Sequence, residues 1–411
     1  FTTMKRYQWM GIMLSLVLLL CSCGTDKEVE KKAGESTSTP SATASVTPLI
    51  SEDEAFSEAE KIVKTMTIEQ KVGQMFLVDL LQLDASPSVD GTAYKATDSM
   101  KQAIIDYHLG GVYLTKENIK SQKQTKKLVQ NLQASVVSGS ALYVAVEEDG
   151  GGENSISAKV EDLKDTGYVT PKEMGQNMTA NQIYESGKTI AGELTKIGIN
   201  LNLAPVADLA SDQNPSYAMR CLGSDADGVA DLLDDFVSGM REGGLSVTLK
   251  TFPGIGNVSA DVTESIAENT DSLMTIRDTN FVPYASGIQA GADCVMVSNA
   301  AYSKLTVKKV PAFMSQDIVT KLLREELGFD GIVMTSPLND NVIENNYTNE
   351  FAVVEAVKAG CDLIVLPGNF KECYEALITA VEEGRIDEKV INTSVRRILQ
   401  NKIQRGILVL E

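Results

Sequence analysis

Histidine is nearly absent from this sequence, in which His108 is the only one among 411 residues. Cysteine is also scarce, and Cys221, Cys294, Cys361 and Cys373, which follow the N-terminal pair, lack the spacing of metal ligands. We therefore expect no metal site and interpret these four cysteines as small buried side chains. A disulfide between Cys361 and Cys373 is possible but not required.

A glycine-rich phosphate loop is missing as well. The triplet Gly150-Gly151-Gly152 follows a predicted strand, but the spacing that opens a dinucleotide-binding helix does not follow it. A turn is the better interpretation, and no cofactor is expected. The formal net charge is −19, and an acidic surface argues against nucleic acid and other anionic polymers as electrostatic partners.

The N-terminus has the pattern of an export signal. Lys5 and Arg6 precede the apolar run WMGIMLSLVLLL at residues 9–20, which has the length of a signal-peptide core and is short for a membrane span. The run leads into LCSCG, which resembles a lipobox with Cys23 as the lipidated residue. Residues 1–23 thus predict a lipoprotein signal peptide and a lipid anchor on the extracytoplasmic face of the cell membrane; an uncleaved N-terminal anchor is the alternative.

Residues 24–52 are rich in Ser, Thr, Ala, Pro and charge, with almost no large apolar side chains. Such a segment buries too little surface to offset its ordering entropy, so we predict a disordered linker. Apolar periodicity begins near residue 52 and continues to the C-terminus. We therefore assign residues 53–411 to one domain, a length that is usual for a barrel with insertions.

Short apolar runs alternate with amphipathic helical stretches along this domain. The runs are apolar nearly throughout, as expected of parallel strands that are buried on both faces. Strand–helix alternation predicts a parallel α/β fold, and a count of eight favours a closed (β/α)8 TIM-type barrel over a doubly wound open sheet. The predicted strands are residues 74–80, 111–115, 141–149, 201–209, 245–252, 294–300, 331–338 and 363–368.

Five segments, in order, resemble motifs of glycoside hydrolase family 3, in its β-N-acetylhexosaminidase branch. AVEEDGG at 145–151 is similar to AVDQEGG, and LNLAPVADL at 201–209 to NxAPVxD. AMRCLGSD at 218–225 is similar to RSFGSD, and LKTFPGIGNVSADVTES at 249–265 to KHFPGHGDTxxDSH. ELGFDGIVMTSPLND at 326–340 is similar to ELGFDGVVxTDDLxM. The resemblance implies a retaining β-N-acetylhexosaminidase barrel without a cofactor.

The catalytic positions implied by the resemblance are changed. Ser336 stands where the family has its nucleophilic Asp, and Asp261-Val262-Thr263 aligns with the DSH triplet, so the Asp of the acid/base pair is kept and the histidine is Thr263. Other pocket histidines of the family are Thr251, Ile255 and Asn299 here. His108 aligns with a helix-to-strand turn away from the site and is interpreted as structural.

Three sugar-binding positions implied by the resemblance keep suitable side chains, namely Glu147, Arg220 and Lys250. These residues could hold an N-acetylglucosamine-containing glycan or a peptidoglycan fragment. They could equally form a structural ion-pair network, since buried charges need partners in either case.

Three functions follow from these features. The first is a pseudoenzyme that binds glycan or a partner at the membrane surface. The second is an active hydrolase of β-N-acetylglucosaminides with relocated carboxylates, Glu264 as the acid and Asp340 as the second group. The third is a structural protein with a closed pocket. Because a serine without a base is a poor nucleophile, we predict that the family reaction is lost.

Overall fold

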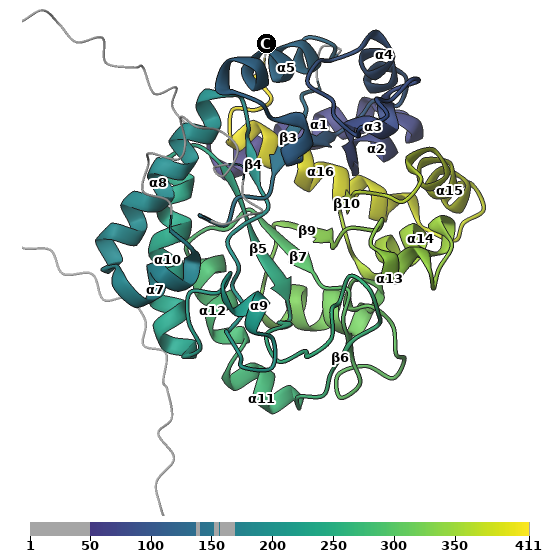
Figure 1. Cartoon of the computed structure of the whole chain (residues 1–411). Helices are drawn as coiled ribbons and strands as arrows, with labels where there is room; N and C mark the ends of the chain where they lie inside the picture. Colours follow the sequence, from purple (N-terminus) through teal and green to yellow (C-terminus); the bar gives the residue numbers. More distant parts are fainter. Residues whose placement is uncertain (1–49, 137–139, 152–155, 157–168, 411) are drawn as a thin grey trace, which may run out of the picture. The chain divides into compact units, whose positions relative to one another are not determined.

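The chain folds as a (β/α)8 barrel, shown as a computed structural model in Figure 1. The structure describes residues 50–136, 140–151, 156 and 169–410. The predicted signal peptide, Cys23 and residues 24–49 of the predicted linker lie outside this range. Within the described residues no helix has the length and apolar character needed to cross a membrane.

Parallel strands form the barrel in the order β10-β1-β2-β3-β4-β5-β7-β9. An isolated parallel bridge between Met334 and Leu363 brings the two end strands together and nearly closes the barrel. Every barrel strand falls inside a run that the sequence predicted. The strands are β1 (Phe76–Asp79), β2 (Gly111–Tyr113), β3 (Tyr143–Val146), β4 (Leu201–Asn202), β5 (Ser246–Phe252), β7 (Cys294–Val297), β9 (Ile332–Thr335) and β10 (Ile364–Val365).

Helices surround the strands (Figure 1). They begin as the sequence chemistry predicts, with Ser and Thr at many N-caps, such as Ser51 before α1 and Thr179 before α8. The main helices are α1 (Glu52–Thr65), α2 (Ile68–Gln74), α4 (Asp98–Asp106), α5 (Gln122–Gln133), α7 (Pro171–Asn177), α8 (Ala180–Lys196), α10 (Ala226–Glu242), α11 (Leu273–Asp278), α12 (Phe281–Gln289), the π-helix η4 (Asp317–Glu326), α14 (Asn349–Ala359), α15 (Phe370–Glu382) and α16 (Glu388–Gln404).

Shorter elements complete the loops. They are α3 (Leu80–Leu83), η1 (Lys116–Asn118), α9 (Pro215–Ala218), η3 (Ala312–Met314), α13 (Asn341–Glu344) and a small sheet of β6 (Glu268–Asn269) and β8 (Ala301–Tyr302). Of these, α9 and α13 carry residues next to the candidate site described below.

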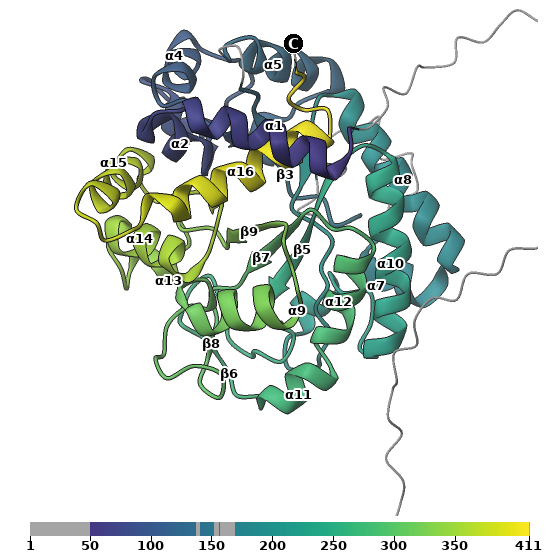
Figure 2. The ribbon, with the colours of Figure 1, turned by 180° about the vertical axis from the view of Figure 1, so that it is seen from behind.

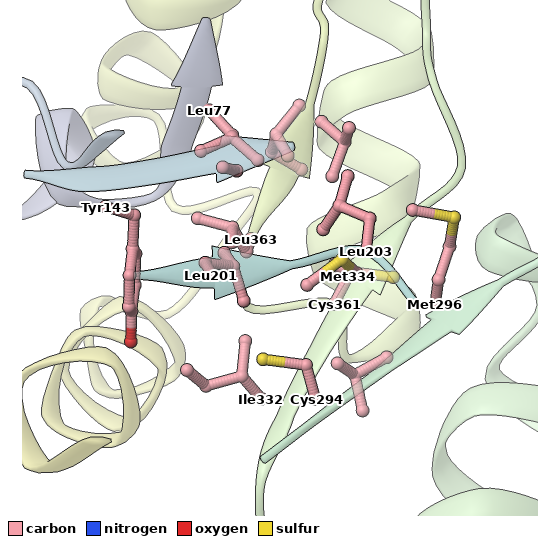
Figure 3. Close-up of a cluster of buried hydrophobic side chains, with 14 of the residues drawn as sticks. Leu77, Tyr143, Leu201, Leu203, Cys294, Met296, Ile332, Met334, Cys361 and Leu363 are labelled. Carbon is pink, nitrogen blue, oxygen red and sulfur yellow. The ribbon is translucent and has the colours of Figure 1, made fainter. Parts of the chain in front are cut away.

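Apolar side chains from the strands fill the barrel interior (Figure 3). Leu77, Leu201 and Met334 are fully buried there. Cys294 and Cys361 belong to the same cluster, and all four described cysteines are buried and free. The cysteines are therefore core side chains, as predicted, and the possible bridge between Cys361 and Cys373 does not form.

His108 lies in the turn between α4 and β2, as predicted. Its φ of 49° is in the left-handed region, and its carbonyl accepts a hydrogen bond from Gln74 Nε2 at 2.7 Å. This contact joins the turn to α2. His108 precedes β2 and is therefore at the amino end of that strand, whereas the candidate site is at the carboxyl ends.

Candidate functional site

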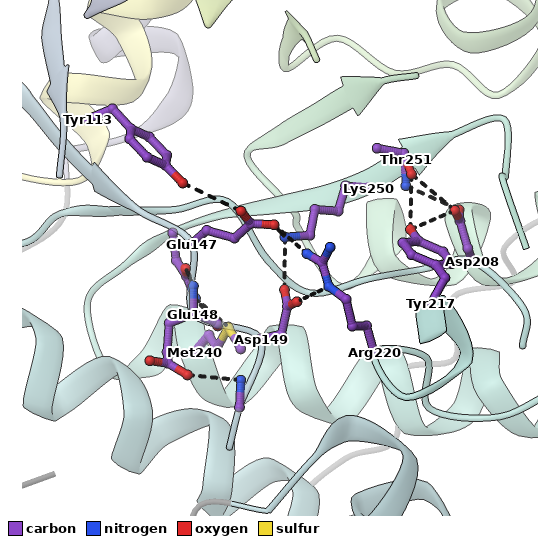
Figure 4. A network of polar contacts seen from close by, with 12 residues as sticks. Tyr113, Glu147, Glu148, Asp149, Asp208, Tyr217, Arg220, Met240, Lys250 and Thr251 are labelled. Carbon is purple, nitrogen blue, oxygen red and sulfur yellow. Dashed lines mark hydrogen bonds and ion pairs between the residues drawn. The ribbon is translucent and has the colours of Figure 1, made fainter. Parts of the chain in front are cut away.

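Two acidic and two basic side chains meet at the carboxyl ends of the strands (Figure 4). Glu147 follows β3, Lys250 lies on β5 and Arg220 follows α9. Lys250 Nζ lies 2.6 Å from Glu147 Oε1 and 2.8 Å from Asp149 Oδ1. Arg220 Nε donates to Asp149 Oδ2 at 2.6 Å, and its Nη2 contacts Glu147 Oε1. Each cation thus contacts both carboxylates.

The four charged groups differ in exposure. Lys250 is 3% exposed and Asp149 is 12% exposed, whereas Glu147 is 40% and Arg220 is 36% exposed. The buried pair supports the other two from within the barrel, and Glu147 and Arg220 reach the solvent. This arrangement combines a structural ion-pair network with two polar groups that a ligand can contact.

The neighbouring positive charges keep the carboxyl of Glu147 ionised. Burial raises the pKa of this carboxyl, but the positive charges of Lys250 and Arg220 outweigh burial and lower the pKa to about 2. Tyr113, at the end of β2, places its hydroxyl 3.5 Å from Glu147 Oε2. Glu147 is therefore an ionised acceptor at neutral pH, suited to accept hydrogen bonds from sugar hydroxyls.

Asp208, which follows β4, is a buried anchor beneath this site. Its carboxylate accepts hydrogen bonds from Thr251 N and Oγ1, both at 3.1 Å, and from Ile255 N at 2.9 Å. The hydroxyls of Tyr217 and Tyr284 donate to it at 2.9 and 2.7 Å. Thr251 and Ile255, which stand where the family motif has histidines, thus bind Asp208 and hold the loop after β5 in place.

Ser336, at the predicted nucleophile position, is held inside the protein. The side chain is 4% exposed, and its hydroxyl donates a hydrogen bond to the carbonyl oxygen of Val297 at 2.9 Å. A nucleophilic serine must instead donate to a base that can take its proton. The hydroxyl of Ser336 is therefore in a structural position.

The acid/base positions are occupied by a local loop contact. Asp261 Oδ1 accepts from Thr263 N at 2.9 Å and from Thr263 Oγ1 at 2.7 Å. The Thr263 carbonyl accepts from Val342 N at 2.7 Å, which joins this loop to α13. Glu264 is exposed and accepts from Asn341 Nδ2 through both carboxylate oxygens, at 3.1 and 3.0 Å. These contacts use the loop's polar groups to fix the loop itself.

Asp340 departs from this pattern. It is the N-cap residue of α13, yet its side chain accepts no hydrogen bond from that helix. It accepts one from Asn299 Nδ2 at 2.7 Å instead, and Asn299 Oδ1 is buried without a hydrogen-bond partner. Burial raises the pKa of Asp340 to about 7, opposed by the Asn299 hydrogen bond and reinforced by the negative charge of Glu147. The sequence analysis named Asp340 as a candidate relocated carboxylate. Because its carboxyl takes up a proton near neutral pH, it is better suited to act as an acid than as a nucleophile.

The raised pKa of Asp340 makes stability depend on pH. An unfolded Asp ionises near pH 3.8, so between pH 3.8 and about 7 the folded chain binds more protons than the unfolded chain. The contribution of Asp340 to folding stability therefore falls as pH rises through this window. We expect Asp340→Asn to unfold at higher urea concentration than wild type at pH 8, and this advantage to disappear near pH 4. The exposed Asp212→Asn is the matched control; an equal advantage of Asp340→Asn at both pH values would contradict the assignment.

No group of three His, Cys, Asp or Glu side chains suited to a metal ion occurs in the part of the chain that the structure describes. Two residues beyond the three predicted sugar-binding ones take part in the cluster. Glu147, Arg220 and Lys250 do meet, but Asp149 and Tyr113 complete their contacts and were not singled out. Their positions at the ends of β3 and β2 were the available signal.

The barrel and its polar mouth are those of a glycosidase-type (β/α)8 domain. The family model described as Glycosyl hydrolase family 3 N terminal domain matches residues 67–401. The chain belongs to this family, and it is β-N-acetylhexosaminidase-like.

Relatives of known identity agree with this assignment. Beta-hexosaminidase A of Pseudoalteromonas piscicida is 26% identical over 369 residues, which are 82% of this chain and 61% of that protein. The beta-hexosaminidase of Stenotrophomonas maltophilia (strain K279a) is 28% identical over 305 residues, 73% of this chain and 85% of that protein. The chain thus spans about three fifths of the longer relative.

Solved structures show the same fold. The family 3 beta-N-acetylglucosaminidase from Paenibacillus sp. str. FPU-7 has a TM-score of 0.75 at 29% identity, covering 84% of this chain and 64% of that chain. The beta-N-acetylhexosaminidase from Beutenbergia cavernae DSM 12333 has a TM-score of 0.71 at 28% identity, covering 82% and 98%. These likenesses support a single barrel.

Proposed function

We propose that the barrel mouth binds a glycan containing N-acetylglucosamine and that this chain has lost the hydrolytic reaction of its family. The observation that carries the proposal is the contrast between two positions. Glu147 is ionised and 40% exposed beside Arg220, whereas Ser336 is buried with its hydroxyl donated to Val297. Glu147 and Arg220, the groups proposed to hold a sugar, thus reach the surface, whereas Ser336 at the predicted nucleophile position is buried.

The relatives support the ligand class. They are beta-hexosaminidases and a beta-N-acetylglucosaminidase by name, so a site derived from theirs is expected to hold N-acetylglucosamine units. An envelope glycan or a peptidoglycan fragment offers such units. Binding is expected to be weak, with a Kd near 1 mM, or about −4 kcal/mol, because Thr251 and Ser336 are committed to other contacts.

Calorimetric titration with N-acetylglucosamine oligosaccharides tests the proposal. Glu147→Gln is expected to weaken binding at least about tenfold, since it removes a charged acceptor from the ligand's hydrogen bonds. Lys250 and Arg220 keep Asp149 as a partner in this variant, so the fold is retained, as a melting curve checks. Glu185→Gln, an exposed Glu on α8, is the control. Equal affinity of wild type and Glu147→Gln would refute the proposed site.

A second candidate, hydrolysis by relocated groups, is favoured by Asp340 alone. Its carboxyl takes up a proton near pH 7, which is the range a general acid needs. Glu264, the other predicted group, is exposed and held by Asn341. The negative charges of Glu147, Asp261 and Glu264 all act on Asp340. Glu147 is paired with Lys250 and Arg220, and Asp261 accepts a hydrogen bond from Thr263. We therefore retain glycan binding as the main proposal.

We further propose that the protein is held on the extracytoplasmic face of the cell membrane by lipid on Cys23. The support is the basic start, the apolar run and the LCSC sequence. Cys23→Ala, expressed as the full chain, is expected to remain unprocessed and to lack acyl label in a fatty-acid incorporation experiment. Cys21→Ala is the matched control and is expected to behave as wild type. Acyl label on the Cys23→Ala chain would refute the anchor.

A further inference from the structure

A cavity of about 590 Å³ lies at the opposite end of the barrel from the candidate site. Its wall includes Asp293, just before β7, and Ile332, the first residue of β9. Helices α1 and α16, which run side by side in Figure 2, supply another wall. Because the strands are parallel, this cavity is at their amino ends, away from Glu147 and Lys250. Its volume suits a small molecule.

Three arginines line the cavity: Arg241 at the end of α10, and Arg396 and Arg397 on α16. The nearest buried acid, Asp293, is already neutralised by Arg405, whose Nη2 lies 2.8 Å from both of its carboxylate oxygens. Arg241 Nε is 3.9 Å from Asp293, beyond hydrogen-bond distance. The cavity therefore has more positive charge than its buried acids balance.

The guanidinium groups also keep unused donors. The Nε atoms of Arg241 and Arg397 are buried without a hydrogen-bond partner. Arg397 uses Nη1 to contact Asp362 at 3.2 Å, and Arg241 uses Nη1 to contact the Ala290 carbonyl at 3.3 Å. A buried donor without an acceptor is costly, and in both residues the donor belongs to a charged group.

Arg396 is the least compensated of the three. Its guanidinium lies 4.4 Å from the centre of the Phe56 ring and donates to Gln400 at 2.7 Å. Among the described residues it forms no ion pair. Burial lowers the pKa of Arg396 and the charge of Arg397 lowers it further, whereas the negative charges of Asp362, Glu60 and Asp330 act in the opposite direction. The acids Glu52 and Asp330 also line the cavity, but both are exposed to solvent, so they compensate these charges weakly.

We propose that this cavity binds a phosphate group through Arg241, Arg396 and Arg397. A planar guanidinium presents paired N–H donors that match the oxygens of a phosphate, and Arg396, which forms no ion pair among the described residues, lines the cavity beside Arg397. The amides of Gln400 and Gln404 add neutral polar groups to the wall. The net charge of −19 disfavours binding of an anionic polymer across the protein surface. A small anion is not disfavoured in the same way at this cavity, where three arginines lie together.

The proposal is tested with pyrophosphate as the probe on the full chain. We expect calorimetry to show binding to wild type, at least about tenfold weaker binding to Arg241→Gln and to Arg396→Gln, and a melting temperature that rises with pyrophosphate in wild type only. The control is Arg385→Gln, whose arginine pairs with Glu350 and Glu383 outside the cavity. Glu147→Gln at the barrel mouth is expected to leave pyrophosphate binding unchanged, so failure here is distinguishable from failure of the glycan site.

A phosphate can belong to a free small molecule or to a lipid headgroup. Cosedimentation with phosphatidylglycerol vesicles, compared with phosphatidylcholine vesicles, separates these sources. Loss of either pyrophosphate binding or vesicle binding in the Arg241→Gln/Arg396→Gln double variant supports the site and identifies its source. The proposal is overturned if wild type binds neither pyrophosphate nor the vesicles. It is also overturned if the double variant binds both probes as well as wild type does.

Discussion

The full chain is expected to release no aryl alcohol from aryl β-N-acetylglucosaminides beyond the rate of a heat-treated sample. The family reaction needs a carboxylate that attacks the anomeric carbon and an acid that protonates the leaving oxygen. Loss of the general acid alone removes about 10²- to 10⁴-fold in rate. The family motif places Ser336 at the attacking position, and its hydroxyl donates to Val297, so we expect the covalent route to be lost as well.

The assay is informative in both directions. The beta-hexosaminidase of Stenotrophomonas maltophilia, measured beside it, shows that the substrate and conditions support turnover. A robust rate in the present chain that disappears on Asp340→Asn would contradict the prediction and would establish Asp340 as a relocated acid. Glu264→Gln is the second variant in that test, because its carboxylate lies on the neighbouring loop and contacts Asn341.

Lys250→Ala is expected to destabilise the protein by about 3 kcal/mol, the lower end of the range for breaking a buried ion pair. Lys250 is 3% exposed and contacts both Glu147 and Asp149, so its removal leaves Asp149, itself 12% exposed, with Arg220 as its cation. Glu147 reaches solvent, which limits the cost. Lys250 is directed inward from β5, so we expect its removal to affect stability as the ion-pair alternative of the sequence implies.

Urea unfolding of three variants separates the causes. Lys250→Met keeps most of the aliphatic stem, so the part of the loss that it shares with Lys250→Ala is due to charge. Lys321→Ala is the surface control, because Lys321 is 65% exposed in its pair with Asp317 and such pairs contribute about 0–1 kcal/mol. A Lys250→Ala variant as stable as Lys321→Ala would show that the four-charge cluster does not support the fold.

The strands were predictable from sequence because burial on both faces requires nearly continuous apolar runs. Their ends were less predictable. The run at 201–209 forms a strand only over Leu201–Asn202. Pro205 has no amide hydrogen to donate, although its carbonyl still accepts from Lys250 N at 3.2 Å. An isolated bridge between Val206 and Lys250 is the pairing that continues there.

The site was predictable in its members but not in its contacts. Family motifs placed Glu147 and Lys250 at strand ends and Arg220 in the loop after the fourth strand, and the barrel brings the three together. A spacing of two is compatible with Glu147 and Asp149 on the same face of an extended chain. Spacing alone does not identify contacts between different segments, so it could not show that Asp149 joins both cations. It also could not show that Asn299 donates to Asp340, since these residues are on separate loops.

Ligand-observed NMR on N,N′-diacetylchitobiose tests the central claim most directly, because one sample reports binding and hydrolysis together. Saturation transferred from the protein to the sugar protons reports binding, and the anomeric proton signals report whether the glycosidic bond is intact. The account predicts transfer that is lost in Glu147→Gln, with unchanged anomeric signals over a day. Accumulation of free N-acetylglucosamine would contradict the loss of catalysis, and absence of transfer in wild type would contradict the glycan site.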